Sequence, residues 1–248
     1  HWINDGAMVV FFFIVGLEIK REFLEGELSM PSQAILPVIA AVGGMAVPAI
    51  FYLLFNFNNP ETFQGWAVPS ATDIAFSLGV LSLLGKRVPI SLKIFLMAIA
   101  IIDDLGAIII IALFYSSDLE LLSLFVVLFI LFFLYLCNKR NLQNIWIYIF
   151  LGFLLWIFIQ NAGIHATISG VLLAIFIPHE KTKQGSLLTC IENKLHPWVA
   201  YLIMPLFALT NAGVYLGDVS LASLSNPVPL GIMTGLFFGK QIGVFFTT

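Results

Sequence analysis

The chain has 248 residues, of which 60% are hydrophobic and 10% are charged, and its formal net charge is −3. Typical soluble domains are about 45–50% apolar and about 25% charged, so a water-soluble fold could not cover this much apolar surface. The small net charge excludes a protein that binds nucleic acid through a basic surface. Cys137 and Cys190 have neither metal-site nor disulfide-framework spacing, and we expect no cofactor.

Nine apolar segments, separated by short polar stretches, follow one another along the chain. They cover approximately residues 6–17, 34–55, 66–84, 90–115, 121–136, 145–159, 166–177, 199–214 and 230–246. A spanning helix needs about 20 residues, so tilt or half-helices must complete the shorter segments. We expect an all-α polytopic membrane protein with a single transmembrane domain over residues 1–248 and about nine or ten spans. Both ends of the chain lie in apolar stretches, which we interpret as cuts within a longer protein.

Basic residues occur in pairs after alternate apolar segments. The pairs are Lys20 and Arg21, Lys86 and Arg87, Lys139 and Arg140, and Lys181 and Lys183. Basic residues in short loops stay on the cytoplasmic side during insertion. The pattern therefore predicts that all four pairs are cytoplasmic.

Asp103 and Asp104 lie in the middle of an apolar segment. A charge at the bilayer centre costs at least about 2.5–3.5 kcal/mol, so such residues normally face a cavity or a partner and have a function. Adjacent residues of a helix point about 100° apart, so the two carboxylates can share a crevice and contact different partners. We expect the pair to bind a proton or a small hard cation, with coupled titration. The alternative is an aspartate pair at the end of a helix, in a loop that hydropathy does not reveal.

Thr72 and Asp73 follow Pro69 in an apolar segment that also contains small hydroxyl residues. Proline disturbs a helix, and irregular backbone at membrane depth survives only where protein buries it or where it lines a cavity. Interrupted spans of this kind mark the binding sites of transporters. An ordinary proline kink, with Asp73 capping the second half-helix, is the alternative.

Lys240 lies in the last apolar segment, where glycine recurs at Gly231, Gly235, Gly239 and Gly243. A stripe of small residues permits close helix packing in membranes. We expect this helix to cross another one closely and to bring the Lys240 ammonium towards Asp103 or Asp104. The alternative is a lysine whose ammonium extends to the membrane surface.

A second group of charged residues lies at the predicted cytoplasmic ends of spans. It consists of Glu18, Arg21, Glu22, Glu192 and His196. The residue types alone allow either a solvated ionic cluster that anchors the helices or a cluster that responds to pH.

Four stretches of the sequence resemble the NhaA family of bacterial sodium/proton antiporters. They are WINDG at 2–6, ATDIAF at 71–76, IIDDLGA at 101–107 and GIHAT at 163–167. The resemblance implies a transporter bundle with inverted repeats and interrupted helices, in a multi-pass protein of the bacterial inner membrane. It also implies electrogenic exchange of cytoplasmic sodium or lithium for external protons, which contributes to pH and sodium homeostasis. The oligomeric state stays open, a homodimer included.

The resemblance also implies a role for individual residues. Asp103 and Asp104 would form the site for sodium and protons, with Asp104 the more direct sodium ligand, and Lys240 would pair with Asp103. Thr72 and Asp73 would lie where two interrupted helices cross, although the chain ends before the second one. The cluster formed by Glu18, Arg21, Glu22, Glu192 and His196 would respond to pH. Thr189, Cys190 and Asn193 replace basic or imidazole groups of the best-known pattern there, which predicts a shifted or weak response.

Two other functions are alternatives to antiport. An intramembrane aspartyl protease needs two carboxylates that converge on one water from separate helices. Here the close pair lies on one segment and no Gly-x-Gly-Asp stretch occurs. A sodium-coupled symporter would need a pocket for an organic substrate, and no feature of the sequence indicates one.

Overall fold

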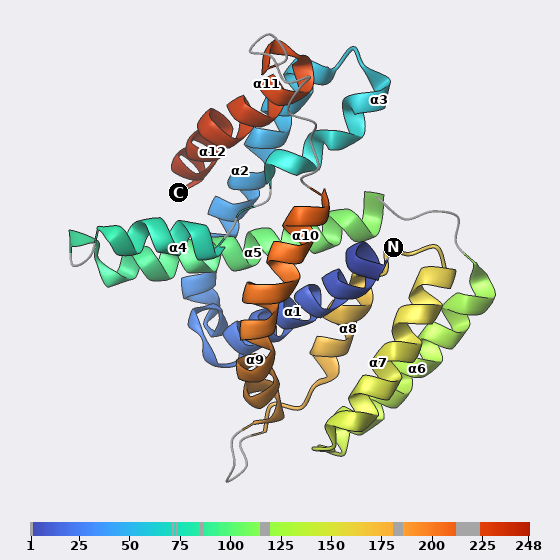
Figure 1. Ribbon diagram of the computed structural model, residues 1–248. Coiled ribbons are helices and arrows are strands. Elements are labelled where there is room, and N and C mark those ends of the chain that lie inside the picture. Colours follow the sequence, from blue (N-terminus) through green and yellow to red (C-terminus); the bar gives the residue numbers. More distant parts are fainter. Residues whose placement is uncertain are drawn as a thin grey trace. The chain divides into compact units, whose positions relative to one another are not determined.

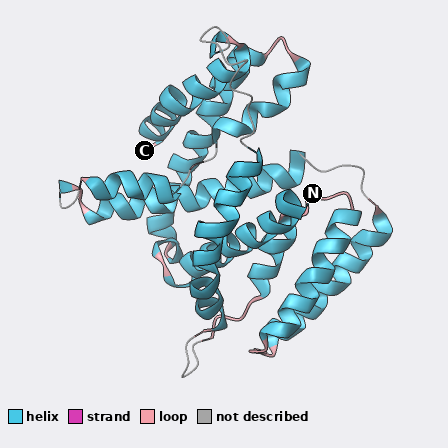
Figure 2. Cartoon of the chain, viewed as in Figure 1, coloured by secondary structure: helices cyan, strands magenta, loops and turns pink. Residues whose placement is uncertain are grey.

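The computed structural model describes residues 2–70, 72, 74–84, 87–114, 120–180, 186–211 and 224–248. Every regular element in these ranges is a helix (Figure 2), which confirms the all-α prediction. The chain divides into two compact units, His1–Leu24 with Ile111–Val214, and Glu25–Ile110 with Tyr215–Thr248. Each unit therefore combines an early and a late part of the chain.

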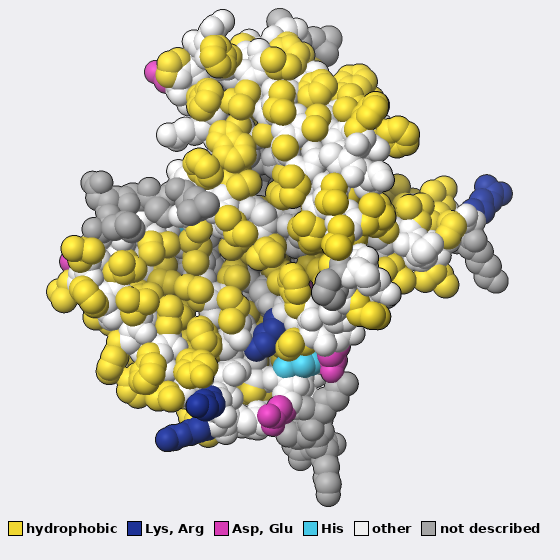
Figure 3. Space-filling view, turned by 180° about the vertical axis from the view of Figure 1, so that it is seen from behind, with side chains coloured by type: hydrophobic (Ala, Val, Ile, Leu, Met, Phe, Trp, Pro, Cys, Tyr) yellow, Lys and Arg dark blue, Asp and Glu magenta, His cyan; other side chains and the backbone are white. Residues whose placement is uncertain are grey.

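Four helices in the described ranges are long and apolar enough to cross a membrane. They are Ser32–Asn56, Ile90–Ala112, Leu121–Lys139 and Pro227–Thr247. Large apolar side chains remain exposed on them, with Phe125 at 70% and Phe129 at 61% of their full exposure. Hydrophobic side chains cover most of the face shown in Figure 3. Such a surface requires lipid as its solvent.

The first unit is a group of helices around one apolar core. Its helices are η1 (Trp2–Ala7), most of α1 (Met8–Glu25), α6 (Leu121–Lys139), α7 (Ile145–Asn161), α8 (Ile168–Phe176), α9 (Leu187–Trp198), η5 (Val199–Ile203) and α10 (Met204–Asn211). α6 and α7 are side by side (Figure 1). The fully buried Leu17, Leu134 and Leu188 come from α1, α6 and α9 and belong to the same core. This shared core holds the ends of α1 and α9 together.

Two helices of this unit differ from the predicted segments. Lys20 and Arg21 were expected in a loop, which is wrong because α1 continues to Glu25. The residues that continue it, EIKREFLE at 18–25, include several strong helix formers but are too polar to count as apolar. α9 begins at Leu187, twelve residues before the predicted segment at 199, and for the same reason hydropathy did not reveal it.

The second unit is organised around the long helix α2 (Pro31–Asn56). Its other elements are η2 (Glu27–Ser29), α3 (Pro60–Phe63), η3 (Gln64–Ser70), α4 (Ile74–Leu83), most of α5 (Ile90–Phe114), α11 (Pro227–Thr234), η8 (Gly235–Gly239) and α12 (Lys240–Thr247). α11, η8 and α12 form one continuous helical stretch that packs along α2 (Figure 1). Residues about 190 positions apart in the sequence are thus neighbours.

The glycine stripe of the last segment is the surface that contacts α2. A Cβ atom on Gly239 would lie 2.8 Å from the Cα atom of Pro48, and one on Gly235 would lie 3.0 Å from the Pro48 carbonyl oxygen. Gly243 faces the backbone of Gly43 at still closer range. The prediction of a close helix crossing is therefore confirmed. Backbones approach this closely only where both surfaces lack bulky side chains.

The predicted interruption of the third apolar segment is also present. η3 ends at Ser70, α4 begins at Ile74, and Thr72 between them is not helical. Pro69 lies inside η3 and is buried. Asp73 is outside the described residues, so its proposed capping role stays a prediction. Because of the interruption, the backbone carbonyl group of Ser70 and the hydroxyl group of Thr72 can contact neighbouring helices.

Replacing Gly239 by alanine tests the packing of α2 against the last helical stretch. The added Cβ would meet backbone atoms of Pro48, which cannot move away as a flexible side chain could. We expect a loss of about 1–3 kcal/mol in the free energy of unfolding of the purified full-length protein. Gly79→Ala in α4 is the matched control because a Cβ there meets nothing within 4 Å. An equal loss in both variants would show that the close approach is unimportant.

Candidate functional site

Asp103 and Asp104 lie near the middle of the 25-residue helix α5. This position excludes the alternative of an aspartate pair in a loop or at a helix end. The Asp103 residue is 1% exposed, whereas Asp104 is half-buried. Because neighbouring residues of a helix point in different directions, the two carboxylates have different surroundings.

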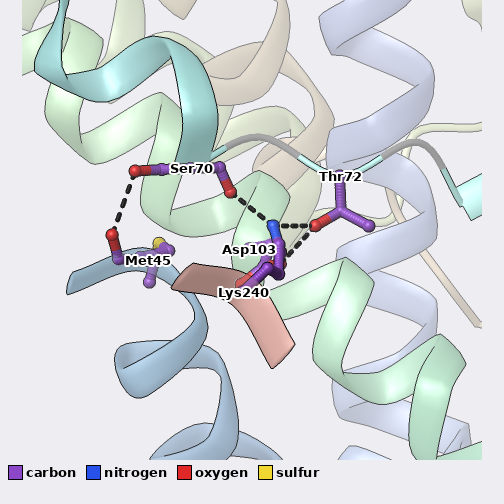
Figure 4. Close-up of polar contacts among 5 residues, drawn as sticks. All are labelled: Met45, Ser70, Thr72, Asp103 and Lys240. Carbon is purple, nitrogen blue, oxygen red and sulfur yellow. Dashed lines mark hydrogen bonds and ion pairs between the residues drawn. The ribbon is translucent and has the colours of Figure 1, made fainter. Parts of the chain in front are cut away.

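The carboxylate of Asp103 is paired with the ammonium of Lys240. Lys240 Nζ lies 3.0 Å from Asp103 Oδ2, and the Thr72 hydroxyl donates a hydrogen bond of 2.5 Å to the same oxygen (Figure 4). A buried charge is stable only when a partner of opposite charge and hydrogen bonds compensate it. The structure thus brings together three residues from α5, α12 and the interruption between η3 and α4.

Two further contacts hold the ammonium in place. Lys240 Nζ donates to the Ser70 carbonyl oxygen at 2.6 Å and also to the Thr72 hydroxyl oxygen (Figure 4). The Ser70 hydroxyl donates to the Met45 carbonyl oxygen at 3.1 Å, which ties the end of η3 to α2. The end of η3 is therefore part of the site through its backbone. Sequence reasoning did not predict Ser70, because a carbonyl group gives no signal in a sequence.

The second carboxylate oxygen of Asp103 has different surroundings from the first. Asp103 Oδ1 is buried and has no hydrogen-bond partner among the described residues. A carboxylate oxygen with unused lone pairs can accept a proton or a hard cation. Lys240 and Thr72 therefore hold Asp103 Oδ2 in place, whereas Asp103 Oδ1 can accept a ligand.

The charged residues of α1 and α9 form a separate cluster in the first unit. Arg21 Nη2 lies 3.4 Å from a carboxylate oxygen of Glu192 and 3.6 Å from one of Glu22, which joins α1 to α9. Glu192 is buried and Arg21 is partly exposed. The charges of the other four predicted residues all act on Glu18. Residues of α1 and α9 thus lie together in one charged cluster, and its response to pH stays a prediction.

Two of the three carboxyl groups of this cluster, those of Glu18 and Glu192, have raised pKa values, and both residues lie beyond the predicted spans. Burial is the main cause that raises the pKa of Glu18, and the neighbouring Glu192 carboxylate raises it further, against the opposing charges of His196 and Arg21. Burial also raises the pKa of Glu192, against Arg21 and His196. Both groups therefore bind protons more readily than exposed glutamates.

His179 is a member of the cluster that sequence reasoning missed. It lies between α8 and α9, and its charge acts on Glu192. Its Nδ1 is 3.2 Å from the hydroxyl of Ser186, the residue that caps α9. A histidine thirteen positions before Glu192 carries no periodic signal, because the chain turns between them. Only folding brings the imidazole to the carboxylate.

Lys20 does not join the carboxylates of the cluster. Its ammonium donates to the carbonyl oxygens of Ile175 at 2.7 Å and Ile177 at 2.5 Å, at the end of α8. Cations are favourable at the C-terminal end of a helix, where the last carbonyl groups lack helical partners. Burial nevertheless lowers the pKa of Lys20 to about 8. This contact fixes α1 to α8 on the side next to the cluster.

The sequence as a whole matches one family of proteins. The family model described as Na+/H+ antiporter 1 matches residues 1–248. The chain belongs to this family. It is therefore a multi-pass membrane protein of a transporter family, and the predicted NhaA resemblance is confirmed. Membership also removes the protease alternative, because the family consists of antiporters.

Individual relatives are similar over nearly the whole chain. A protein of Pelagibacter ubique is 59% identical over 245 residues, one of Sulfurovum sp. 56% over 248, and one of Vibrio cholerae 53% over 246. All three are named Na(+)/H(+) antiporter NhaA. The matches cover 98–99% of this chain and 63–64% of the relatives. The chain thus spans somewhat less than two thirds of their length.

Replacing Thr72 by valine tests the contacts around the buried pair. Valine has the same shape, but it cannot donate to Asp103 or accept from Lys240. We expect the free energy of unfolding of the purified full-length protein to fall by about 1–3 kcal/mol, because two buried partners lose a hydrogen bond. Thr210→Val is the control, since the hydrogen bonds that this exposed hydroxyl makes with described residues all lie within its own turn. Equal effects would contradict a special role for Thr72.

Proposed function

We propose that the full-length protein to which this chain belongs exchanges sodium or lithium ions for protons across the bacterial inner membrane. The observation that supports this function best is the Asp103 carboxylate, which is buried mid-helix with one oxygen fixed by Lys240 and Thr72. The adjacent Asp104 supplies further carboxylate oxygens. Membership of the Na+/H+ antiporter 1 family supports the same function.

The proposed mechanism is competition for these oxygens. A proton or an alkali cation neutralises the aspartate pair, and binding of one disfavours binding of the other, because two charges in a low-dielectric site repel. Asp104 and Asp103 Oδ1 hold the cation, since Asp103 Oδ2 already accepts from Thr72 and contacts Lys240. Thr72 and Asp73 complete the site at the interruption between η3 and α4.

Charge balance supports electrogenic exchange. The combined charge of the two aspartates changes by two between their fully protonated and fully ionised forms, and the Lys240 ammonium offsets one of the two negative charges in the ionised form. A site of two carboxylates can release more than one proton for each monovalent cation that it binds. We therefore propose more protons than sodium ions per cycle, with cytoplasmic sodium expelled.

The proposed topology follows from the pattern of basic loops. Residues 1–248 form a single transporter domain of about nine or ten spans, and the loop pairs at 86–87, 139–140 and 181–183 face the cytoplasm with Lys20 and Arg21. Lys139 ends α6 and Arg140 caps it, as expected of basic residues at a membrane surface.

Replacing Asp104 by asparagine tests the proposed exchange. We expect Asp104→Asn to lower sodium-driven proton movement at least about 100-fold, the effect of losing roughly 2.7 kcal/mol of binding. The measurement is sodium uptake into vesicles that contain the full-length protein. Glu61→Gln, an exposed acidic residue of α3, should retain exchange. Sodium exchange that persists after Asp104→Asn would contradict the proposal.

Experiments on the same vesicles distinguish antiport from symport with an organic solute. Antiport predicts that protons leave the protein when sodium is added without any solute. A requirement for an organic solute would favour symport instead. The arrangement of Asp103 and Lys240 requires no such solute.

We also propose that the cluster of Glu18, Arg21, Glu22, Glu192 and His196 responds to pH. A carboxyl whose pKa is raised in the folded state keeps its proton to higher pH than in the unfolded chain. The folded protein then binds more protons, and its stability falls as the pH rises from the ordinary glutamate pKa through the raised one. Ionisation of Glu18 in this range places a second negative charge beside the Glu192 carboxylate, and this repulsion opposes the contact between α1 and α9.

Replacing Glu18 by glutamine tests this response. The variant lacks the titrating group, so the unfolding temperature of the full-length protein should vary less between about pH 4.5 and neutral pH. The pH profile of exchange should shift with it. Glu61→Gln should leave both profiles unchanged. A Glu18→Gln variant with the original pH dependence of stability and exchange would leave only the anchoring role.

A further inference from the structure

Side chains from two other helices hold the end of α8. The Lys20 side chain of α1 donates to the carbonyl oxygens of Ile175 at 2.7 Å and Ile177 at 2.5 Å. The Asn138 amide of α6 donates to the carbonyl oxygen between them, that of Phe176, at 2.9 Å. The last carbonyl groups of a helix have no partner within the helix. Three successive carbonyl groups at the end of α8 therefore find their donors on α1 and α6.

α1 and α8 pack closely on the same side of α1. A Cβ atom on Gly16 would lie 2.8 Å from the Cβ atom of Ala174 and 3.2 Å from the Cα atom of Val171. Lys20 follows Gly16 by four residues and thus lies on the same face of α1, beside the last turn of α8. Because the rest of the contact is close packing of backbones, Lys20 can control the last turn of α8 without separating the two helices.

The surroundings of Lys20 fit a neutral amine better than an ammonium. The side chain is partly buried, and within the described ranges its hydrogen-bond partners are two carbonyl groups and no carboxylate. A neutral amine has two N–H groups, one for each carbonyl, whereas an ammonium has a third donor and a charge without a counter-charge. Burial disfavours such a charge and lowers the pKa of Lys20 to about 8.

Charged residues on the surrounding elements do not cause this shift. α8 itself contains no ionisable side chain. The charged and histidine side chains around it include Glu18, Arg21 and Glu22 of α1, Lys139 of α6, His179 and Glu180 after α8, and Glu192 of α9. Burial is the cause that lowers the pKa of Lys20, and none of these charges contributes among the described residues. Lys20 therefore titrates separately from the cluster.

We propose that Lys20 is a pH-dependent latch on the last turn of α8, which closes when its amine is neutral and favours sodium/proton exchange at alkaline pH. In the closed state the amine caps the carbonyl groups of Ile175 and Ile177. In the open state the ammonium extends into water, and the last turn of α8 loses this cap. The regulatory role rests on the exchange proposed above, whereas the latch itself does not.

The direction of the response follows from proton binding. Lys20 has a pKa of about 8 when it is buried against α8 and an ordinary value of 10.5 when it is exposed, so the closed state binds fewer protons. A rise in pH through this range therefore favours the closed state. Ionisation of Glu18 acts in the opposite sense on the other neighbour of α1, because it opposes the contact with α9. Rising pH thus strengthens the contact of α1 with α8 and weakens its contact with α9.

Amide hydrogen exchange in the last turn of α8 tests the latch without measuring transport. The full-length protein in lipid nanodiscs is exchanged at pH 7 and pH 9, and mass spectrometry follows residues 172–180. Each rate is divided by that of the unfolded peptide at the same pH, which removes the intrinsic effect of pH. We expect protection to rise about tenfold from pH 7 to pH 9, because closing lowers the pKa of Lys20 from 10.5 to about 8.

Lys20→Arg is the decisive variant because a guanidinium keeps its charge at both pH values. The rise in protection should disappear. Lys20→Met, which has neither the charge nor the donors, should also lose it, so a poor fit of arginine alone cannot decide the result. Lys139→Arg is the matched control, since Lys139 is an exposed lysine at the end of α6, and it should keep the full rise.

Vesicles that contain the same variants test the regulatory role. The ratio of the sodium exchange rate at pH 9 to that at pH 7 should fall by up to about tenfold in Lys20→Arg and stay unchanged in Lys139→Arg. An unchanged ratio in Lys20→Arg would overturn the regulatory role.

The latch itself would be overturned by protection that falls or stays constant as the pH rises, or by a rise that persists in Lys20→Arg. The second result would assign the response to other groups, such as His179 or Glu180. Absence of sodium exchange in the unmodified protein would overturn the proposed function and the regulatory role with it. Hydrogen exchange would still decide in that case whether Lys20 closes on α8.

Discussion

The buried ion pair between Asp103 and Lys240 is the interaction on which the second unit depends. Neither charge could remain in apolar surroundings without the other, and the Thr72 hydroxyl and the Ser70 carbonyl complete their hydrogen bonds. These groups come from three separate segments. The pair therefore fixes how α5, α12 and the end of η3 meet. Any change that separates these elements would leave two buried charges without partners.

Close helix packing makes this pair possible. In lipid there is little hydrophobic drive for helices to associate, so contact depends on surfaces that fit closely. Gly235 and Gly239 let the last helical stretch approach the backbone of α2 at Pro48, and Lys240 follows at once. The interruption at Thr72 supplies polar groups that a continuous helix would use internally. The small residues and the interrupted helix thus both allow the buried ion pair between Asp103 and Lys240 to form.

The charged groups of the first unit lie outside the predicted spans, unlike the buried ion pair of the second unit. Its charged cluster lies in the polar parts of α1 and α9, where Arg21 joins Glu192. Burial still raises the pKa of Glu18 and Glu192, so proton binding and the contact between α1 and α9 are linked. An apolar cavity in the same unit has Phe13, Phe153 and Trp156 among its lining residues. The second unit therefore contains a buried ion pair, whereas the first unit contains a charged cluster whose proton binding is linked to a helix contact.

The sequence by itself determined the all-helical membrane fold, the mid-helix position of Asp103 and Asp104, the interruption near Thr72 and the glycine stripe, because hydropathy, helix breakers and residue spacing are local properties. It could not show that α1 and α9 extend beyond their apolar parts, since polar helix formers resemble loops in hydropathy. Only the tertiary structure decided that Lys240 contacts Asp103, that the Ser70 carbonyl joins the site, and that His179 acts on Glu192. These contacts join residues far apart in the chain, and their energies depend on burial and distance, which no local pattern contains.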